Sequence, residues 1–385
     1  MRFATSLAAL VLVVGCGSAD REAAFSKSEH AHTSLGSVTP SASASEPQAE
    51  VLPQTSIDKA SVWMSRRVDD WRRNTPQVGN NFACATTCHT SVPFATALHS
   101  TNLVERESPA SWLESGVRER VMSNPDWRSA TPYYGTPASD DGKRSLGSEA
   151  VLNALVLAGA DDREAADRAF VHLWRAQRED GGFDWMDYNL APWENGDEFV
   201  GAALAALALR TRYRGASLEK ICKPAASHAL TEPEERLASF LYKRREKATG
   251  FARAFALWAT AELPLAFSDE DGAHGVALLR ASQNDDGGFS WSSLGVEAQG
   301  AESDATPTAT ALLAMCGSRT RLDAETRSAA RRALAWLARH QAEDGSFEAR
   351  SPNVDSARNH SLARDAAAGY TVTAWATCRC AFAAE

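Results

Sequence analysis

The chain has 385 residues, of which 44% are hydrophobic and 23% charged, and its formal net charge at pH 7 is −9. Acidic and basic residues are spread along the chain, which gives no reason to expect a nucleic-acid partner. The length is sufficient for one large domain or two small ones.

The first sixteen residues resemble a bacterial lipoprotein signal peptide. A positive start, Met1-Arg2, precedes the apolar run Leu7–Val14, which is too short to span a bilayer as a mature helix. The stretch Val13–Cys16 resembles a lipobox, which implies cleavage before Cys16 and a lipid on this cysteine. An ordinary signal peptide with a chance cysteine is the alternative. The resemblance implies an exported, periplasm-facing protein anchored to the cell envelope, and the position of Asp20 favours the outer membrane.

Residues 17–55 are predicted to be a flexible tether. They are rich in Ser, Ala, Thr, Pro and Glu and contain almost no large apolar residues, so they cannot bury a core. We therefore expect a single folded domain over residues 56–385.

The stretch Cys84-Ala-Thr-Thr-Cys88-His89 is one residue longer than the C-x-x-C-H of c-type haem attachment. Four interpretations are open: a covalent haem c with His89 as an iron ligand, a disulfide, a zinc site that needs a further ligand, and two buried thiols. Export favours haem, because haem c is attached on the periplasmic side. His99 or Met64 would be candidates for a second axial ligand.

Three segments repeat one pattern, in which an amphipathic helix ends with Gln and is followed by an Asp-Gly turn and a Phe. The segments are Gln177–Phe183, Gln283–Phe289 and Gln341–Phe347. The Gly supplies a left-handed residue that stops the helix, the Asp can bond to its own turn, and the Phe can fold back onto apolar surface. A repeat of about 55 residues, with one degenerate copy, accounts for their spacing.

Other helices of the chain are far more apolar. Glu149–Gly159, Glu198–Leu209, Asp304–Met315 and Tyr370–Phe382 carry Ala, Leu and Val on nearly all sides, so we expect them to be buried. Alternating two-faced and apolar helices indicate two concentric layers. Six such pairs predict an all-α fold, a closed (α/α)6 toroid of six helical hairpins with essentially no sheet. The outer helices are expected to start near Asp58, Pro109, Asp162, Pro233, Asp269 and Asp323, and the inner ones near Cys84, Ser148, Asp197, Phe251, Ser303 and Ala367.

The Q-x-x-D-G-G-F turns resemble the QW-type repeats of squalene–hopene cyclases, terpenoid cyclases and protein prenyltransferases. The stretch 181–209 is similar to squalene-cyclase-like repeat proteins of bacteria, which also carry a Cys-His motif on the first inner helix. The resemblance covers roughly residues 57–385. It implies a terpenoid cyclase/prenyltransferase-like toroid that binds an apolar, isoprenoid-like molecule in its central cavity.

The same resemblance suggests one candidate acid. Class II terpene cyclases protonate an alkene with a D-x-D-D-T motif, and this chain has Glu302-Ser-Asp304-Ala305-Thr306 at the corresponding place. The alignment implies Asp304 as the proton donor and Glu302 as the first acid. Ala305 replaces the last Asp, which puts the strong acid that this chemistry needs in doubt.

Helix capping is the alternative role for these acids. Ser148-Glu149, Asp197-Glu198 and Ser303-Asp304 each pair an expected N-cap residue with an acid in the first turn. The repeat would bring Glu149, Glu198 and Asp304 to one mouth of the toroid as a polar rim.

An aromatic segment is the second candidate for the cavity or its rim. Its members are Phe183, Asp184, Trp185, Asp187, Tyr188, Trp193 and Glu194. The aromatic side chains could line a cavity for an isoprenoid or a carbohydrate, or simply pack a loop over the rim. Paired carboxylates could serve glycoside cleavage, but the repeated turns favour the terpenoid-cyclase branch.

A prenyltransferase zinc site is not expected. Ser290-Trp-Ser-Ser follows Phe289 without the required Asp-x-Cys, and Cys378 and Cys380 are two apart on a helix, which makes them poor joint ligands. Three functions therefore stay open: an enzyme or binding protein for an isoprenoid-like molecule, a haem-bearing redox protein, and a binding scaffold without chemistry.

Overall fold

The computed structural model describes residues 52–74, 77–78, 81–82, 90–100, 111–190, 192–215, 222, 229–260, 263, 265–296, 300–318, 322–353 and 357–383. All of them belong to one compact unit, Ala49–Glu385. The predicted signal peptide and nearly all of the predicted tether lie outside the described residues.

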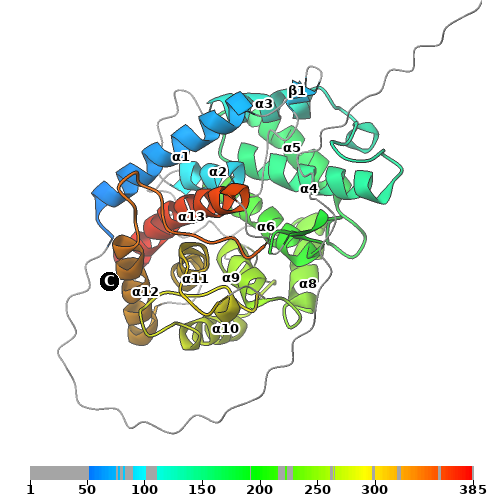
Figure 1. Ribbon diagram of the computed structural model, residues 1–385. Coiled ribbons are helices and arrows are strands. Elements are labelled where there is room, and N and C mark those ends of the chain that lie inside the picture. The colour runs from blue at the N-terminus through cyan, green and yellow to red at the C-terminus, as the bar shows by residue number, and fades with distance from the viewer. Residues whose placement is uncertain are drawn as a thin grey trace, which may run out of the picture. The chain divides into compact units, whose positions relative to one another are not determined.

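Six helices among the described residues form a closed inner ring (Figure 1). They are α2 (Ser91–Ser100), α4 (Asp140–Leu157), α6 (Glu198–Arg214), α9 (Gly250–Ala259), α11 (Ala305–Gly317) and α13 (Ala357–Ala383). Each helix packs against the next in this order, and α13 packs against α2. The last inner helix therefore meets the first.

Six more helices of the described chain form an outer layer. They are α1 (Gln54–Asn74), α3 (Ser111–Met122), α5 (Arg163–Ala176), α8 (Glu232–Arg244), α10 (Asp269–Ala281) and α12 (Ala324–Arg339). Each packs against one or two inner helices: α1 against α2 and α13, α3 and α5 against α4, α8 against α6, α10 against α9 and α11, and α12 against α11 and α13. The predicted (α/α)6 toroid of six helical hairpins is confirmed.

Two inner helices begin earlier than predicted. α4 starts at Asp140, where the side chain of Ser139 caps it, and α13 starts at Ala357. In α4 the residues become continuously buried only from Ser145 onward. The predicted starts lie where the apolar run begins, which is where the helix becomes buried. Polar helical turns before this point are therefore not included in the prediction. The start predicted near Cys84 lies outside the described residues.

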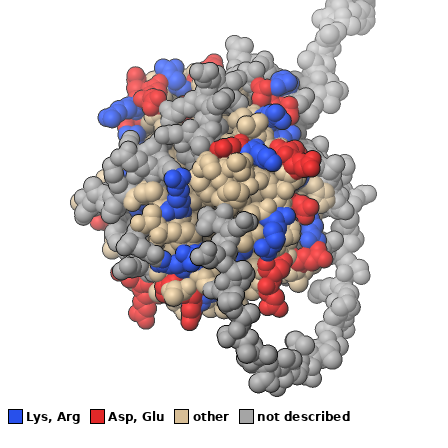
Figure 2. Space-filling view, turned by 90° about the vertical axis from the view of Figure 1, so that its left-hand side faces the viewer, with Lys and Arg blue, Asp and Glu red and all other residues tan. Residues whose placement is uncertain are grey.

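The strands are confined to two short antiparallel ladders in connecting segments. β1 (Gln77–Val78) pairs with β2 (Asn81–Phe82), and β3 (Asp187–Leu190) pairs with β4 (Glu194–Asn195). Two short 3-10 turns, η2 (Trp127–Ser129) and η4 (Ser292–Leu294), complete the elements used below. On the face shown in Figure 2, acidic and basic side chains lie interspersed among the described residues.

The glutamine of each repeated turn ties that turn to the next outer helix. Gln177 Nε2 donates hydrogen bonds to the carbonyl oxygens of Gly181, at 3.1 Å, and Pro233 in α8, at 3.0 Å. The same pair of bonds joins Gln283 to Gly287 and to Ala329 in α12, and Gln341 to Gly345 and to Ser56 in α1. The third glutamine thus joins the last outer helix to the first.

The turns have the predicted chemistry. Asp180, Asp286 and Asp344 each accept a hydrogen bond from the main-chain N–H two residues later, and Phe183, Phe289 and Phe347 are fully buried. Gly181 has a φ of 93°, and a Cβ there would lie 2.1 Å from the carbonyl oxygen of Arg236. Only glycine fits this position, because both the backbone conformation and the neighbouring helix exclude a side chain.

The inner helices pack closely because many of their residues are small. Every residue of α2 and α11 is buried. A Cβ on Gly369 of α13 would lie 2.4 Å from the Cβ of Pro93 in α2. Buried threonines in this region donate to carbonyls of their own helix four residues earlier, as Thr310 and Thr377 do at 2.9 and 2.8 Å, so their hydroxyls are satisfied without a partner helix.

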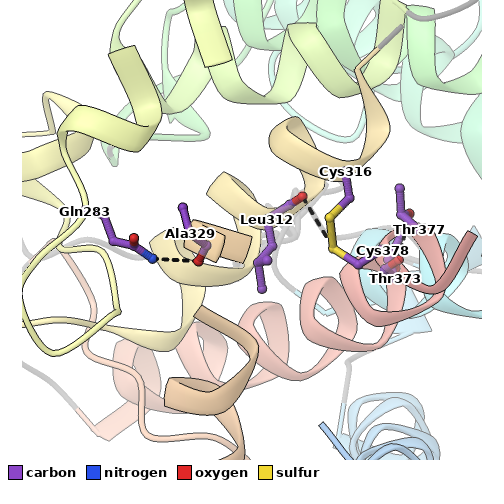
Figure 3. The surroundings of a disulfide bond; sticks show 7 residues. All are labelled: Gln283, Leu312, Cys316, Ala329, Thr373, Thr377 and Cys378. Atoms are coloured by element: carbon purple, nitrogen blue, oxygen red, sulfur yellow. Dashed lines mark hydrogen bonds between the residues drawn. A yellow bond between two sulfur atoms is a disulfide. The ribbon is translucent and has the colours of Figure 1, made fainter. Parts of the chain in front are cut away.

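Two disulfides fasten the end of α13. Cys378 bonds to Cys316 at the end of α11 (Figure 3), and Cys380 bonds to Cys222, which precedes α8. The sequence offered no framework for these pairs. The prediction that Cys378 and Cys380 are poor joint ligands agrees with their bonding to different partners.

Candidate functional site

Asp304 lies at the N-terminus of α11 and is its N-cap residue. Its side chain is 3% exposed. Oδ1 accepts a hydrogen bond from Thr306 N at 2.9 Å, and Oδ2 accepts one from Arg350 N at 2.5 Å. The carboxylate therefore caps its own helix and ties the segment after Phe347 to that helix.

Burial raises the pKa of Asp304 to about 6, while the main-chain hydrogen bonds from Arg350 and Thr306 and the charges of Arg350 and His360 oppose the rise. With this pKa the group is mostly ionised at pH 7. The hydrogen-bond geometry agrees, because both oxygens accept.

Glu302 is a surface residue rather than a buried neighbour of Asp304. Its side chain is 75% exposed, and its carboxylate pairs with the Arg350 guanidinium at 2.5 Å. Arg350 therefore touches both predicted acids, through its main chain at Asp304 and through its side chain at Glu302.

The capping prediction is correct at one helix and wrong in detail at two. Asp197 caps α6 as expected. At α11 the cap is Asp304 itself and not Ser303. Ser148 and Glu149 lie within α4, since that helix begins at Asp140, so they are neither cap nor first turn.

Glu149 is buried against an outer helix and is not an exposed rim acid. Its carboxylate receives two hydrogen bonds from Arg120 of α3, at 2.5 and 3.0 Å, and both side chains are nearly inaccessible. The Arg120 guanidinium also lies over the rings of Trp127 and Tyr133, 5.3 and 4.9 Å from their centroids. Burial raises the pKa of Glu149, and the bonds from Arg120 counteract it. This pair is structural.

Two predicted rim acids gather around Arg178. The guanidinium binds Glu198 at 2.6 Å and Asp184 at 3.3 Å, and all three side chains are partly exposed. Asp187 and Tyr188 lie in β3, where Asp187 faces Arg144 at 3.8 Å, and Glu194 lies half-buried in β4. The carboxylates of Glu198 and Asp184 are therefore paired with Arg178, a residue that was not predicted.

The two predicted tryptophans are buried. Trp185 packs on Gly201 of α6, and its Nε1 donates to the carbonyl of Trp193 at 2.5 Å. The Trp193 ring meets Phe251 of α9 at 5.6 Å and Trp291 at 5.8 Å between centroids. These rings pack the segment onto the inner helices, as the packing alternative predicts.

The aromatic contacts continue into the ring of inner helices. Phe251 contacts Phe255 at 5.3 Å, and Phe255 contacts Tyr370 of α13 at 5.2 Å. Because α11 stands between α9 and α13 in the ring, rings from these two helices can touch only on its inner side. We call Trp193, Phe251, Phe255, Trp291 and Tyr370 the interior aromatic cluster; all are buried.

The interior aromatic cluster is joined to Asp304 by two hydrogen bonds. Trp291 Nε1 donates to the carbonyl of Arg350 at 3.1 Å, and Arg350 N donates to Asp304 at 2.5 Å. The main chain of Arg350 thus fixes the position of the Trp291 ring relative to the Asp304 carboxylate.

A polar pocket of about 1160 Å³ lies on the outer side of Asp304. Its walls come from four segments: the turn after α10, residues 301–304 before α11, residues between Trp336 at the end of α12 and Arg350, and Arg364 of α13. They include Asn284, Asp286, Glu302, Asp304, Glu348 and Arg350. Across the described residues, no group of three or more His, Cys, Asp or Glu side chains is placed to hold a metal ion.

Cys84, Cys88 and His89 lie outside the described residues, so the predicted haem site has no geometry here. Thr90, the next residue, donates to Asp365 of α13 at 2.7 Å, and Asp365 also binds Arg67 of α1 at 2.8 Å. His99, a predicted candidate for the second axial ligand, is buried, and its Nε2 lies 3.1 Å from the carbonyl oxygen of Val156.

A closed double layer of helical hairpins joined by Gln-Asp-Gly turns defines an α/α toroid. Residues 145–356 match the family model described as the prenyltransferase alpha-alpha toroid domain. The match spans more than half of the chain, and the chain belongs to this family. No curated protein matches it.

Solved structures with this fold include the type II terpene cyclase MstE from Scytonema. Without ligand, MstE has a TM-score of 0.52 and 14% identity, over 84% of this chain and 96% of that chain. A variant in complex with geranylgeranyl dihydroxybenzoate, its substrate, has a TM-score of 0.51 and 15% identity, over 84% and 97%. At this identity the likeness shows the fold alone. None of the described helices is long and apolar enough to cross a membrane.

Proposed function

We propose that the toroid binds an apolar, isoprenoid-like molecule among the rings of the interior aromatic cluster and does not cyclise it. The observation that carries the proposal is the contact between Phe255 and Tyr370 across the inner face of α11, which places aromatic side chains in the centre of the ring. Aromatic side chains offer large apolar surfaces of defined shape, as ligand cavities do.

The relatives support the apolar ligand. MstE, which shares the fold, binds geranylgeranyl dihydroxybenzoate, a molecule with a long isoprenoid chain. In this chain the interior rings touch one another, so a ligand has to separate them. The free energy of that opening lowers the apparent affinity.

The environment of Asp304 argues against alkene protonation. Such an acid must hold its proton until the alkene arrives, whereas both oxygens of Asp304 accept main-chain N–H groups and its pKa of about 6 leaves it mostly ionised at pH 7. Ala305 stands where the motif has a further Asp. Binding without turnover is therefore the function that the geometry supports.

Tryptophan fluorescence during titration with geranylgeraniol tests the binding. Phe255→Leu removes an interior ring, and Phe170→Leu is its matched control, because Phe170 is a buried phenylalanine of the outer helix α5. We expect Phe255→Leu to weaken binding by at least about tenfold, equivalent to about 1.4 kcal/mol, and Phe170→Leu to leave it unchanged. Equal effects of the two variants, or no binding to the wild type, would overturn the proposal.

Product analysis separates binding from catalysis. The wild type and Asp304→Asn are incubated with squalene and geranylgeraniol, and the extracts are examined by mass spectrometry. We expect no cyclised product from either protein. A product made by the wild type and lost in Asp304→Asn would show that Asp304 is a catalytic acid.

A covalent haem c on Cys84 and Cys88 with His89 as an iron ligand is the second candidate, as part of a redox protein. The two disulfides engage Cys222, Cys316, Cys378 and Cys380, so they leave Cys84 and Cys88 for another role. Expression with haem-attachment machinery should then give a Soret band and a mass increase of one haem. No band and a mass six hydrogen atoms below that of the fully reduced chain, two for each of three disulfides, would indicate a Cys84–Cys88 disulfide instead.

For the location, we propose an exported protein anchored by a lipid on Cys16 to the periplasmic side of the outer membrane. The support is the lipobox-like sequence together with two disulfides, because disulfides persist in oxidising compartments. Radiolabelled palmitate should enter the wild type and not Cys16→Ser, and the variant should be released from the membrane fraction.

A further inference from the structure

The polar pocket beside Asp304 does not suit an apolar ligand. Pockets for apolar molecules are lined mainly by hydrophobic side chains, whereas charged and amide groups dominate here. A ligand that fits this pocket would therefore be polar, unlike the isoprenoid-like molecule proposed for the interior.

Hydrogen-bond donors and acceptors both point to this pocket. Arg350 pairs with Glu302 and Arg364 pairs with Asp344, but the two side chains are still 53% and 39% exposed, so each guanidinium keeps N–H groups for a ligand. Glu302 and Glu348 supply exposed carboxylate acceptors. Since the two signs of charge are mixed, the walls favour a neutral molecule whose groups both donate and accept, which is what hydroxyl groups do.

One wall is a flat aromatic stack. The rings of Trp336 and His340 lie 3.8 Å apart and nearly parallel, with an interplanar angle of 13°. Asp286 holds Trp336 Nε1 at 2.9 Å, and His340 Nδ1 lies 2.7 Å from the carbonyl of Trp336. Fixed rings need little ordering when a ligand packs on them.

Carboxylates alone would suggest a cation, but their partners argue otherwise. Asp286 accepts from Trp336, Ser303 and Gly288 N, and Glu302 is paired with Arg350. Among the described residues no three metal-binding side chains are gathered at one point.

From mixed donors and acceptors beside a rigid aromatic wall, we propose that this pocket binds a neutral polyhydroxylated ring of the sugar type. Hydroxyls bond to the guanidinium and carboxylate groups, and the C–H face of the ring packs on His340, whose ring is backed by the buried ring of Trp336. The ring comes either from a free sugar or from the sugar head of a lipid. The first source is independent of the proposed function, and the second rests on it.

Saturation-transfer NMR with a panel of methyl glycosides, namely methyl β-D-glucopyranoside, methyl β-D-galactopyranoside and methyl α-D-mannopyranoside, tests the pocket. We expect at least one glycoside to bind with a Kd of about 1 mM. Glu348→Gln and Arg350→Gln should each weaken this binding by at least about fivefold, which is about 1 kcal/mol. Glu343→Gln is the control, because Glu343 is an exposed acid in the same turn but does not line the pocket.

Two results would overturn the proposal: no binding of any glycoside by the folded wild-type protein up to about 50 mM, a concentration that saturates a site with the expected Kd, or binding that Glu348→Gln and Arg350→Gln leave unchanged. Circular dichroism of each variant confirms that the fold is intact.

Geranyl β-D-glucopyranoside distinguishes the two sources. Tighter binding than the methyl glycoside, weakened by both Phe255→Leu and Glu348→Gln, would support a lipid-borne sugar. Equal affinity, sensitive to Glu348→Gln alone, would support a free sugar. Because the methyl glycosides do not need the interior aromatic cluster, failure of isoprenoid binding leaves the sugar test intact.

Discussion

The main-chain N–H of Arg350 donates to Oδ2 of Asp304 at 2.5 Å, across 46 residues of sequence. The bond places the segment after the third repeated turn on top of α11, and it uses the oxygen that a proton donor would need. Because this carboxylate is buried and accepts two main-chain hydrogen bonds, its protonation should affect the stability of the protein.

Asp304 should make the stability of the protein depend on pH in an unusual direction. Its pKa is about 6 when folded, above the 3.8 of an unperturbed Asp side chain, so the folded state binds the proton more tightly than the unfolded chain. This contribution is complete below pH 4 and is lost as the pH rises through 6. Relative to Asp304→Asn, the wild type should gain about 2–3 kcal/mol of unfolding free energy between pH 7.5 and pH 4. A difference between the two proteins that stays constant over this range, in urea unfolding at several pH values, would contradict the assignment.

The turn glutamines should be important for stability. Gln341→Leu keeps the volume but removes the donor to the carbonyls of Gly345 and Ser56, so we expect the free energy of unfolding to fall by about 2–3 kcal/mol. Gln177→Leu and Gln283→Leu should each lower the free energy of unfolding by a similar amount, because both remove the same pair of bonds. Gln54→Leu is the control, since Gln54 is exposed and bonds only to a side chain of its own helix. If guanidinium unfolding gives Gln341→Leu and Gln54→Leu the same free energy of unfolding, the hydrogen bonds of Gln341 contribute little to stability.

The buried pair of Arg120 and Glu149 should be costly to break. Arg120→Met leaves the Glu149 carboxylate buried without its partner, and we expect a loss of about 3–5 kcal/mol. Replacing both residues with methionine should recover much of this loss. Arg118→Met, which breaks an exposed pair with Asp162, should change stability much less, because solvent screens the pair. Thermal unfolding of the three variants and the wild type orders them, and equal effects of Arg118→Met and Arg120→Met would refute the argument.

The buried disulfide should stabilise the toroid. It joins Cys316 and Cys378 across 62 residues, and restriction of the unfolded chain by a loop of that length contributes about 4 kcal/mol. We expect Cys316→Ala/Cys378→Ala to lose stability on that scale. Dithiothreitol should lower the stability of the wild type more than that of the double variant, which has only the bond between Cys222 and Cys380 left among the described pairs. An unchanged midpoint would exclude this contribution.

The repeats could be predicted from the sequence because their chemistry is local. A Gln, an Asp-Gly turn and a Phe lie within seven residues, and alternating apolar and two-faced helices reveal the two layers. The start of α4 was predicted less well. The apolar run begins near Ser148, whereas the helix begins at Asp140 with polar turns that the apolar pattern does not mark.

The partners of the candidate residues could not be predicted, since they come from distant parts of the chain. Arg350 reaches Asp304 across 46 residues, Arg120 reaches Glu149 across 29, and Cys378 reaches Cys316 across 62, in each case through the packing of neighbouring elements. No local pattern marks such pairs. The polar pocket combines residues from four separate segments for the same reason.

The contact of α1 with α13 has a consequence for synthesis on the ribosome. Leu52 accepts a hydrogen bond from Trp375 Nε1 at 3.1 Å, across 323 residues. Until α13 has been synthesised, the nascent chain is an open arc with an unpaired apolar surface at each end. During most of translation, the face of α1 that will contact α13 is therefore exposed. A circular permutant that begins at a later hairpin would shift this vulnerable seam to another position in the same ring.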